Sequence, residues 1–172
     1  MPLKSLRAWL GVDAPGEQEV EPLRETLEAL DHLEPDHARR LAAFAYLLGR
    51  VAHADQHVSP EETGSMEALV AEHGGLSRDQ AAIVVRLAQR SNRLFGGTAH
   101  FLVAREFSAL AAYDQKLALM RCLFALSAAD KAISTAEEGE IHRIAQELRI
   151  DRPDLIALRL AYQRHLPGLS RE

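Results

Sequence analysis

The chain has only one cysteine, so no disulfide can form within it. That cysteine, Cys122, lies in the apolar run of residues 117–126, where we expect a small buried side chain rather than a nucleophile. No apolar stretch reaches the length of a membrane-spanning helix. A lone cysteine also fits a reducing compartment. These shortages together predict a cytoplasmic protein without a transmembrane segment.

A net positive charge and enzyme motifs are also lacking. The net charge of −5 and a pI near 5.9 argue against nucleic-acid binding, which requires a basic face. The chain contains no glycine-rich phosphate loop, no Gly-x-Ser-x-Gly elbow and no His-Glu-x-x-His zinc motif. We therefore expect that the protein is not an enzyme. A small-molecule enzyme between the halves of the chain is a weaker alternative, which would require a pocket with converging polar groups.

Signals for β-strands are absent as well. No segment alternates apolar and polar residues convincingly, and Asn-Gly and Asp-Gly hairpin turns do not occur. Apolar residues recur instead at helical spacing, as in Leu41, Phe44, Leu48 and Val51. The predicted fold class is all-α.

An acidic turn occurs twice in the chain. Residues 54–62 and 129–137 share the pattern Ala-Asp-x-x-(Val/Ile)-Ser-x-x-Glu, 75 positions apart. The apolar positions around the turn also correspond, so each copy predicts three helices. Their expected ranges are 38–54, 60–73 and 78–95, then 114–129, 135–148 and 152–165, with a linking helix over 98–112. The result is a compact bundle of about seven helices.

Residues 1–19 are predicted to be a short N-terminal segment outside the helical domain. Leu3, Leu6 and Leu10 give a short amphipathic helix, and residues 11–19 give a linker centred on Pro15-Gly16. We expect this helix to dock on its own domain, with contact to a membrane surface as the alternative. The helical domain then comprises residues 20–172.

Capping residues set helix boundaries within the repeat. Ser59 and Ser134 are each followed three residues later by a glutamate, which is the capping-box spacing. Gly74-Gly75 can take the left-handed conformation that ends a helix. The sequence thus predicts a helix start after each serine and a helix end at the glycine pair.

The acidic turns are candidate metal ligands. Aligned with a calcium-binding EF-hand loop, they lack the early oxygen ligands and the required glycine, so an EF-hand is not expected. The two turns could still share one hard cation, Ca²⁺ or Mg²⁺, through Asp55, Glu62, Asp130 and Glu137. The alternative is that these carboxylates only cap helices and no cofactor is bound.

Two further sets of side chains are candidate sites. Arg86, Arg90 and Arg93 follow helical spacing and form a candidate surface for an anionic partner, with a solvated or ion-paired face as the alternative. His53 and His57 have a spacing that occurs in zinc sites, but the second copy has alanines there, so solvated histidines are favoured. The other six histidines are scattered singly and form no constellation.

Residues 41–165 resemble the tellurite-resistance TerB-like family. The resemblance is strongest in residues 128–138 and 141–148, and Asp114-Gln115-Lys116-Leu117 also looks like the family. It implies a compact domain of about seven helices that is linked with tellurite resistance and stress response in bacteria. It further implies divalent-cation binding at the acidic turns and action in complexes near the membrane.

Taken together, the sequence predicts a non-enzymatic, cytoplasmic TerB-like domain that binds a protein partner, with a divalent cation at the paired acidic turns. The partner is an unidentified protein, either membrane-associated or a second copy of the chain in a homodimer. Nucleic acid is not an expected partner. The alternative function is a purely structural interaction module without metal, in which the turns are only helix caps.

Overall fold

The computed structural model describes residues 29–30, 32–52, 63–91, 97–129 and 132–165. Within these ranges the protein has seven α-helices and no strand, which confirms the all-α prediction. The helices are α3 (Pro35–Ala52), α4 (Thr63–Gly74), α5 (Arg78–Ser91), α6 (Gly97–Leu110), α7 (Tyr113–Ala128), α8 (Thr135–Glu147) and α9 (Arg152–Ala161). A short 3₁₀ helix, Gln163–His165, follows α9. The predicted N-terminal helix and linker over residues 1–19 lie outside the described residues.

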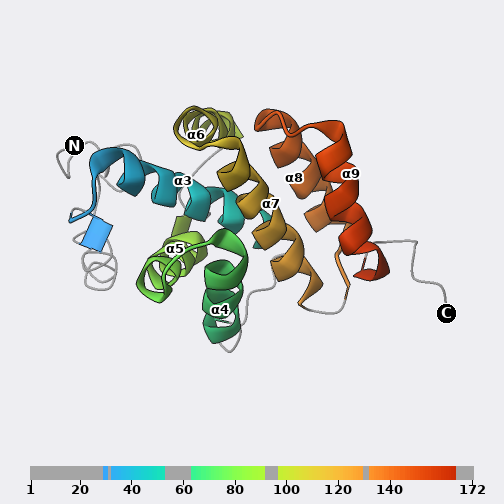
Figure 1. The fold of residues 1–172 in the computed structure, drawn as a ribbon, viewed down its shortest axis with the longest axis horizontal. Helices are drawn as coiled ribbons and strands as arrows, with labels where there is room; N and C mark the ends of the chain where they lie inside the picture. Colours follow the sequence, from blue (N-terminus) through green and yellow to red (C-terminus); the bar gives the residue numbers. More distant parts are fainter. Residues whose placement is uncertain (1–28, 31, 53–62, 92–96, 130–131, 166–172) are drawn as a thin grey trace.

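Helix α3 occupies the centre of the bundle. It contacts α5, α6, α7 and α8, and α7 in turn contacts α4 and α9 (Figure 1). Every residue of α3 from Leu41 to Val51 is buried. Over this stretch α3 is enclosed on all sides, whereas the spacing of Leu41, Phe44, Leu48 and Val51 by itself indicates only one buried face. None of the described helices is both long and apolar enough to cross a membrane.

Helix boundaries follow the local chemistry of the chain. Pro35 is the first residue of α3, where a missing backbone N–H costs nothing, so this helix begins three residues before its predicted start. Ser77 caps α5, because its hydroxyl accepts a hydrogen bond from the backbone N–H of Gln80 at 3.2 Å. The seven observed helices occur in the order that the repeat predicts. The structural similarity of the two three-helix copies remains a prediction.

Helices α4 and α8 each end at a residue in the left-handed backbone conformation. Gly75, after α4, has a φ of 65°, and Arg149, after α8, has a φ of 58°. The first copy of the predicted repeat has one extra glycine after His73, so the offset falls from 75 to 74 there and Gly75 corresponds to Arg149. After α8 the backbone N–H of Ile150 bonds to the carbonyl oxygen of Ala145 at 2.9 Å, the pattern of a Schellman cap. Gly74 serves a different purpose: a Cβ there would lie 3.3 Å from both the Cys122 sulfur and the Phe44 ring.

The start of α9 is attached to the start of α7 by one tyrosine. The Tyr113 hydroxyl donates a hydrogen bond to Asp154 Oδ2 at 2.6 Å and accepts one from the backbone N–H of Asp151 at 2.9 Å. At the other end of α7, the rings of Phe124 and Tyr162 stack with centroids 5.7 Å apart. These contacts hold α9 along α7, at the edge of the bundle in Figure 1.

Candidate ligand cavity and acidic turn

The second acidic turn starts α8 with a complete capping box. Glu137 donates its backbone N–H to the Ser134 hydroxyl at 3.1 Å, and Glu137 Oε2 accepts the backbone N–H of Ser134 at 2.7 Å. The predicted capping role of Ser134 is therefore confirmed. The Glu137 residue is only 7% exposed, so its carboxylate is one of the few buried charges among the described residues.

The predicted metal site is only partly within the described residues. Glu137 is included, whereas Asp55, Glu62 and Asp130 lie outside, as do His53 and His57. Across the ranges that are described, no group of three or more histidine, cysteine, aspartate or glutamate side chains is placed to hold a metal ion. The shared cation site therefore stays a prediction.

Other acidic side chains of α8 have structural partners. Glu138 pairs with Arg159 of α9 at 2.5 Å. Glu140 and Glu147 both bind the guanidinium of Arg50, which projects from the buried helix α3. These pairs join α8 to its neighbours on either side, so the carboxylates that follow Glu137 are already engaged in holding the bundle together.

The arginine row is also only partly described. Arg86 is exposed on α5, as a partner-binding residue must be. The side chains of Arg90 and Arg93 lie outside the described set. The partner-binding assignment of the three arginines therefore remains a prediction.

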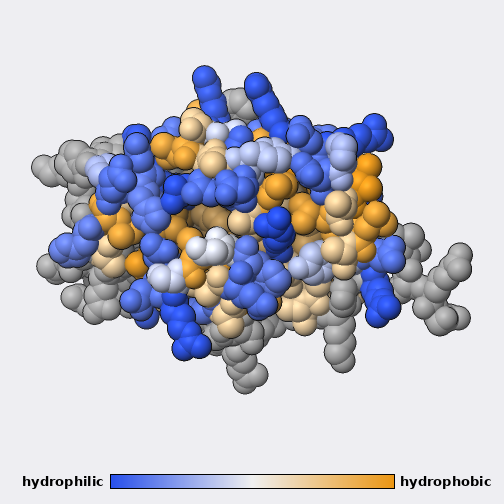
Figure 2. Space-filling view, in the orientation of Figure 1, coloured by the Kyte–Doolittle hydropathy of each residue, from blue (hydrophilic) through white to orange (hydrophobic). Residues whose placement is uncertain are grey.

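A cavity opens where α3, α5 and α7 meet. Its volume is about 280 Å³, and in the space-filling view the surface is hollowed at this place (Figure 2). Apolar side chains make up its inner walls: Leu41, Phe44, Leu76, Phe107 and Ala118. The Phe44 and Phe107 rings meet edge to face with centroids 6.2 Å apart, which gives the cavity a rigid aromatic wall.

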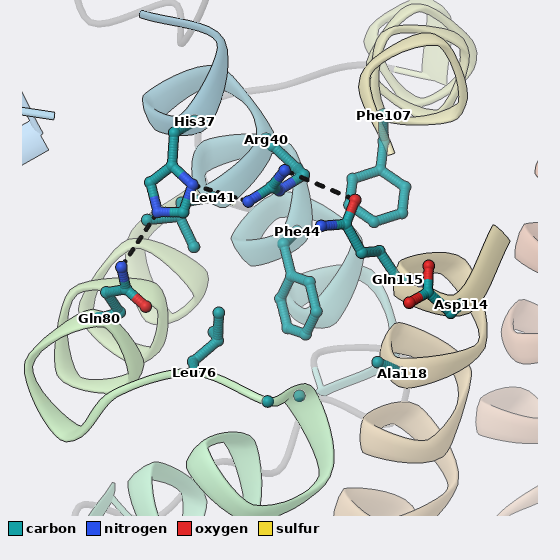
Figure 3. Close-up of a pocket in the computed structure, with 12 residues that line it drawn as sticks. His37, Arg40, Leu41, Phe44, Leu76, Gln80, Phe107, Asp114, Gln115 and Ala118 are labelled. Carbon is teal, nitrogen blue, oxygen red and sulfur yellow. Dashed lines mark hydrogen bonds between the residues drawn. The ribbon is translucent and has the colours of Figure 1, made fainter. Parts of the chain in front are cut away.

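Polar side chains form a chain across the mouth of this cavity (Figure 3). Arg40 places one guanidinium nitrogen 2.7 Å from His37 Nδ1 and another 3.5 Å from Gln115 Oε1. On the other side of the imidazole, Gln80 Nε2 lies 3.0 Å from His37 Nε2. The mouth therefore brings together one cation, one imidazole and two amides, from helices that are far apart in the sequence.

The imidazole of His37 is kept neutral by its surroundings. Burial lowers the pKa of His37 below its ordinary value of 6.5, and the nearby charge of Arg40 lowers it further, against a smaller opposing effect of Glu34. Arginine can only donate hydrogen bonds, so His37 Nδ1 must accept from Arg40 and cannot carry a proton. The proton of the neutral ring is then on Nε2, on the side of Gln80.

The sequence did not predict that these polar side chains lie together at a cavity. His37 was one of the six histidines with no apparent partner. Gln80 follows Ser77 at the capping-box spacing, and Gln115 lies in a segment that resembles the family, but neither pattern indicates a cavity. The only signal is that His37 and Arg40 share one face of a helix otherwise rich in apolar residues. Contacts between residues 43 or 75 positions apart depend on how the helices meet, which the local pattern does not contain.

Comparison with known proteins identifies one family. The family model described as "Tellurite resistance protein TerB" matches residues 40–160, which include both acidic turns and most of the cavity. No curated protein matches the chain, and no solved structure matches it.

Proposed function

The chain belongs to the tellurite resistance protein TerB family, and from this premise we propose that it is a binding protein. It is a tellurite-resistance-associated domain without catalytic activity, which acts in the cytoplasm. It binds a protein partner, and it binds Ca²⁺ or Mg²⁺ between its two acidic turns. The main support for the proposal is that the family match extends over residues 40–160 and so includes both copies of the turn.

The chemistry of Glu137 is compatible with a cation ligand. Its Oε2 accepts the backbone N–H of Ser134, which fixes the position of the carboxylate at the start of α8. A ligand that is fixed by a capping box loses little side-chain freedom when it binds an ion. Hard cations such as Ca²⁺ prefer carboxylate oxygens, which Asp55, Glu62 and Asp130 would supply from the other positions of the repeat.

One observation favours the second candidate function, a structural interaction module without metal. The protein completes the capping box at α8 by itself, with both of its hydrogen bonds formed. A turn of that kind needs no cation to be stable. The two candidates therefore differ in a single measurable property, the affinity of the folded protein for divalent cations.

Calorimetric titration with Ca²⁺, Mg²⁺ and Mn²⁺ separates the two candidates. The test variant is Asp55→Asn, Glu62→Gln and Asp130→Asn together, which keeps Glu137 and its cap. The matched control is Asp36→Asn, Glu72→Gln and Asp79→Asn, which removes the same charge from exposed positions. Binding that is lost in the test variant and kept in the control supports the cation site. Absence of both heat and a shift in melting temperature at millimolar metal would contradict it.

Partner binding is tested through the arginine row. Replacing Arg86, Arg90 and Arg93 with alanine should weaken the recovery of a bound protein from the native cell. The control replaces Arg105, Arg121 and Arg164, which are exposed on α6, on α7 and in the 3₁₀ helix, and it changes the net charge equally. Equal recovery with both triple variants would remove the arginine row from the proposal.

A further inference from the structure

We propose that the cavity between α3, α5 and α7 binds a small carboxylate ligand with an apolar body. The carboxylate would lie at the mouth, against Arg40 and the amides of Gln80 and Gln115, and the apolar body would lie against Phe44 and Phe107. This site is separate from the acidic turns, and it does not depend on cation binding there.

The mouth of the cavity has more hydrogen-bond donors than acceptors. The neutral ring of His37 can accept at one nitrogen only, yet Arg40 and Gln80 both direct N–H groups at it. Rotating the Gln80 amide would turn its oxygen toward His37, but that oxygen already accepts the backbone N–H of Ser77 at 3.3 Å. In either arrangement one N–H group at the mouth lacks an acceptor within the protein, and a ligand oxygen could take that place.

Within the described part of the chain, Arg40 is a cation without a carboxylate partner. Among the described residues no acidic oxygen lies within 4 Å of its guanidinium, whereas Arg39 and Arg50 on the same helix are both ion-paired. Its contacts are the neutral His37 and a 3.5 Å contact with Gln115 Oε1, which also accepts the backbone N–H of Ala112. A guanidinium has five donors in a planar fork that matches a carboxylate, so most of its capacity is available to a ligand.

Three helices begin at this mouth. His37, Gln80 and Gln115 are each the third residue of their helix, in α3, α5 and α7 respectively. The N-terminus of a helix carries a partial positive charge and favours an anion. Asp114, the one acid among the described residues that line the cavity, is exposed and accepts the backbone N–H of Gln115. Arg40 and the three helix ends therefore make the mouth favourable for one negative charge.

The inner walls select for an apolar body. The cavity of about 280 Å³ lies just below the usual range for small-molecule sites, so it suits a ligand with a short chain or a single ring. An inorganic oxyanion would satisfy the donors but would leave the aromatic wall uncovered. A neutral apolar molecule would cover the wall but would leave Arg40 without an anion. An aromatic or short aliphatic carboxylic acid satisfies both.

Phenylacetate is a suitable probe, because it combines a carboxylate with one ring. In an NMR titration of the full chain, we expect saturable shifts at the side-chain amides of Gln80 and Gln115 and at the ring of His37. The neutral amide of the same acid, phenylacetamide, should bind at least about tenfold more weakly, because a hydrogen bond to a charged group is the stronger kind. Inorganic phosphate should also bind more weakly, because it lacks the apolar body.

Two variants locate the site. Arg40→Gln should weaken phenylacetate binding by about tenfold or more, whereas Arg39→Gln, which removes the same charge from the same helix, should change it less than about twofold. Ala118→Leu keeps every polar group and fills the cavity, so it should abolish binding. Circular dichroism and the melting temperature verify that each variant is folded, and the comparison of ligands stands even if one variant is not.

Several results would overturn the proposal. The cavity would not be a carboxylate site if millimolar phenylacetate gave no saturable shifts, or if phenylacetamide bound equally well. Equal binding of phosphate would show that the apolar walls contribute nothing. Equal weakening by Arg39→Gln and Arg40→Gln would show a general effect of charge.

Discussion

The guanidinium of Arg50 forms a bidentate ion pair with the carboxylate of Glu147, 97 positions further along the chain. The two contacts measure 2.8 and 3.3 Å, and Glu140 binds the same guanidinium at 3.1 Å. Arg50 is buried, with its side chain 3% exposed, while the two glutamates keep about a fifth to a quarter of their surface in solvent. This cluster is the polar contact that joins the central helix α3 to α8.

We predict that Arg50→Met destabilises the protein strongly. Removing the arginine leaves two partly buried carboxylates without their shared counter-ion, so the free energy of unfolding should fall by about 3 kcal/mol in urea denaturation. The control is Arg143→Ala, because Arg143 binds the same Glu140 but its side chain is 71% exposed. That pair should contribute less than about 1 kcal/mol. Similar losses in the two variants would contradict a special role for the buried arginine.

The capping box at α8 gives a second prediction. Ser134→Ala removes the acceptor for the backbone N–H of Glu137, so the free energy of unfolding should fall by about 1 kcal/mol. Thr135→Ala is the control, because Thr135 is exposed at the first position of the same helix. It should change stability by less than about 0.5 kcal/mol. Thermal or urea unfolding of both variants measures the difference, and equal effects would mean that the cap adds nothing.

The two left-handed helix ends give a third, paired prediction. A Cβ at Gly75 would contact nothing within 4 Å, so the cost of Gly75→Ala is the backbone strain at a φ of 65°, about 1 kcal/mol. Arg149 already bears such strain at a φ of 58°, so Arg149→Gly should raise the free energy of unfolding, by up to about 1 kcal/mol.

Gly139 provides the control for this pair. It lies inside α8, and a Cβ there also contacts nothing within 4 Å. Gly139→Ala should therefore stabilise the protein by about 0.5–1 kcal/mol, because alanine favours a helix interior. The two alanine variants differ only in backbone conformation, so opposite signs in urea unfolding are expected. The same sign for both would refute the strain argument.

Sequence reasoning was accurate wherever one short segment determines the structure. Ser134 and Gly75 mark helix ends through their own hydrogen bonds and dihedral angles, so their roles can be read locally. Arg149 could not be identified, because an arginine in the left-handed region is imposed by the packing that follows the helix. The full burial of α3 was missed for a related reason: its neighbours come from four other helices.

The two candidate sites, the acidic turn and the cavity, also differ in how far the sequence predicts them. The acidic turn was visible because its residues recur in a fixed pattern, and Glu137 lies where the capping spacing places it. The cavity was not visible, because His37, Gln80 and Gln115 come from three helix starts that only the tertiary fold brings together. The local patterns around Gln80 and Gln115 indicate helix starts, and nothing in them connects the two glutamines with His37.

The fourth prediction concerns the buried thiol. Burial raises the pKa of Cys122 to about 12, although the charge of Arg121 opposes this slightly. In the unfolded chain a cysteine has a pKa of about 8.5. Because the pKa is higher in the folded state, the thiol's contribution to stability is complete below about pH 8.5 and is lost as the pH rises toward 12. Between pH 8.5 and 10, the unfolded state alone releases this proton.

Cys122→Ala should remove that part of the pH dependence. Over the interval from about pH 8.5 to 10, the free energy of unfolding of the natural protein should fall by about 2 kcal/mol more than that of the variant. Burial also raises the pKa of Tyr46, to about 12, but an unfolded tyrosine titrates only near pH 10, so its effect begins above this interval. Urea unfolding under reducing conditions at several pH values gives both curves. Parallel curves would show that the thiol ionises in the folded protein as readily as in the unfolded chain, against the complete burial of its side chain between α7 and Gly74.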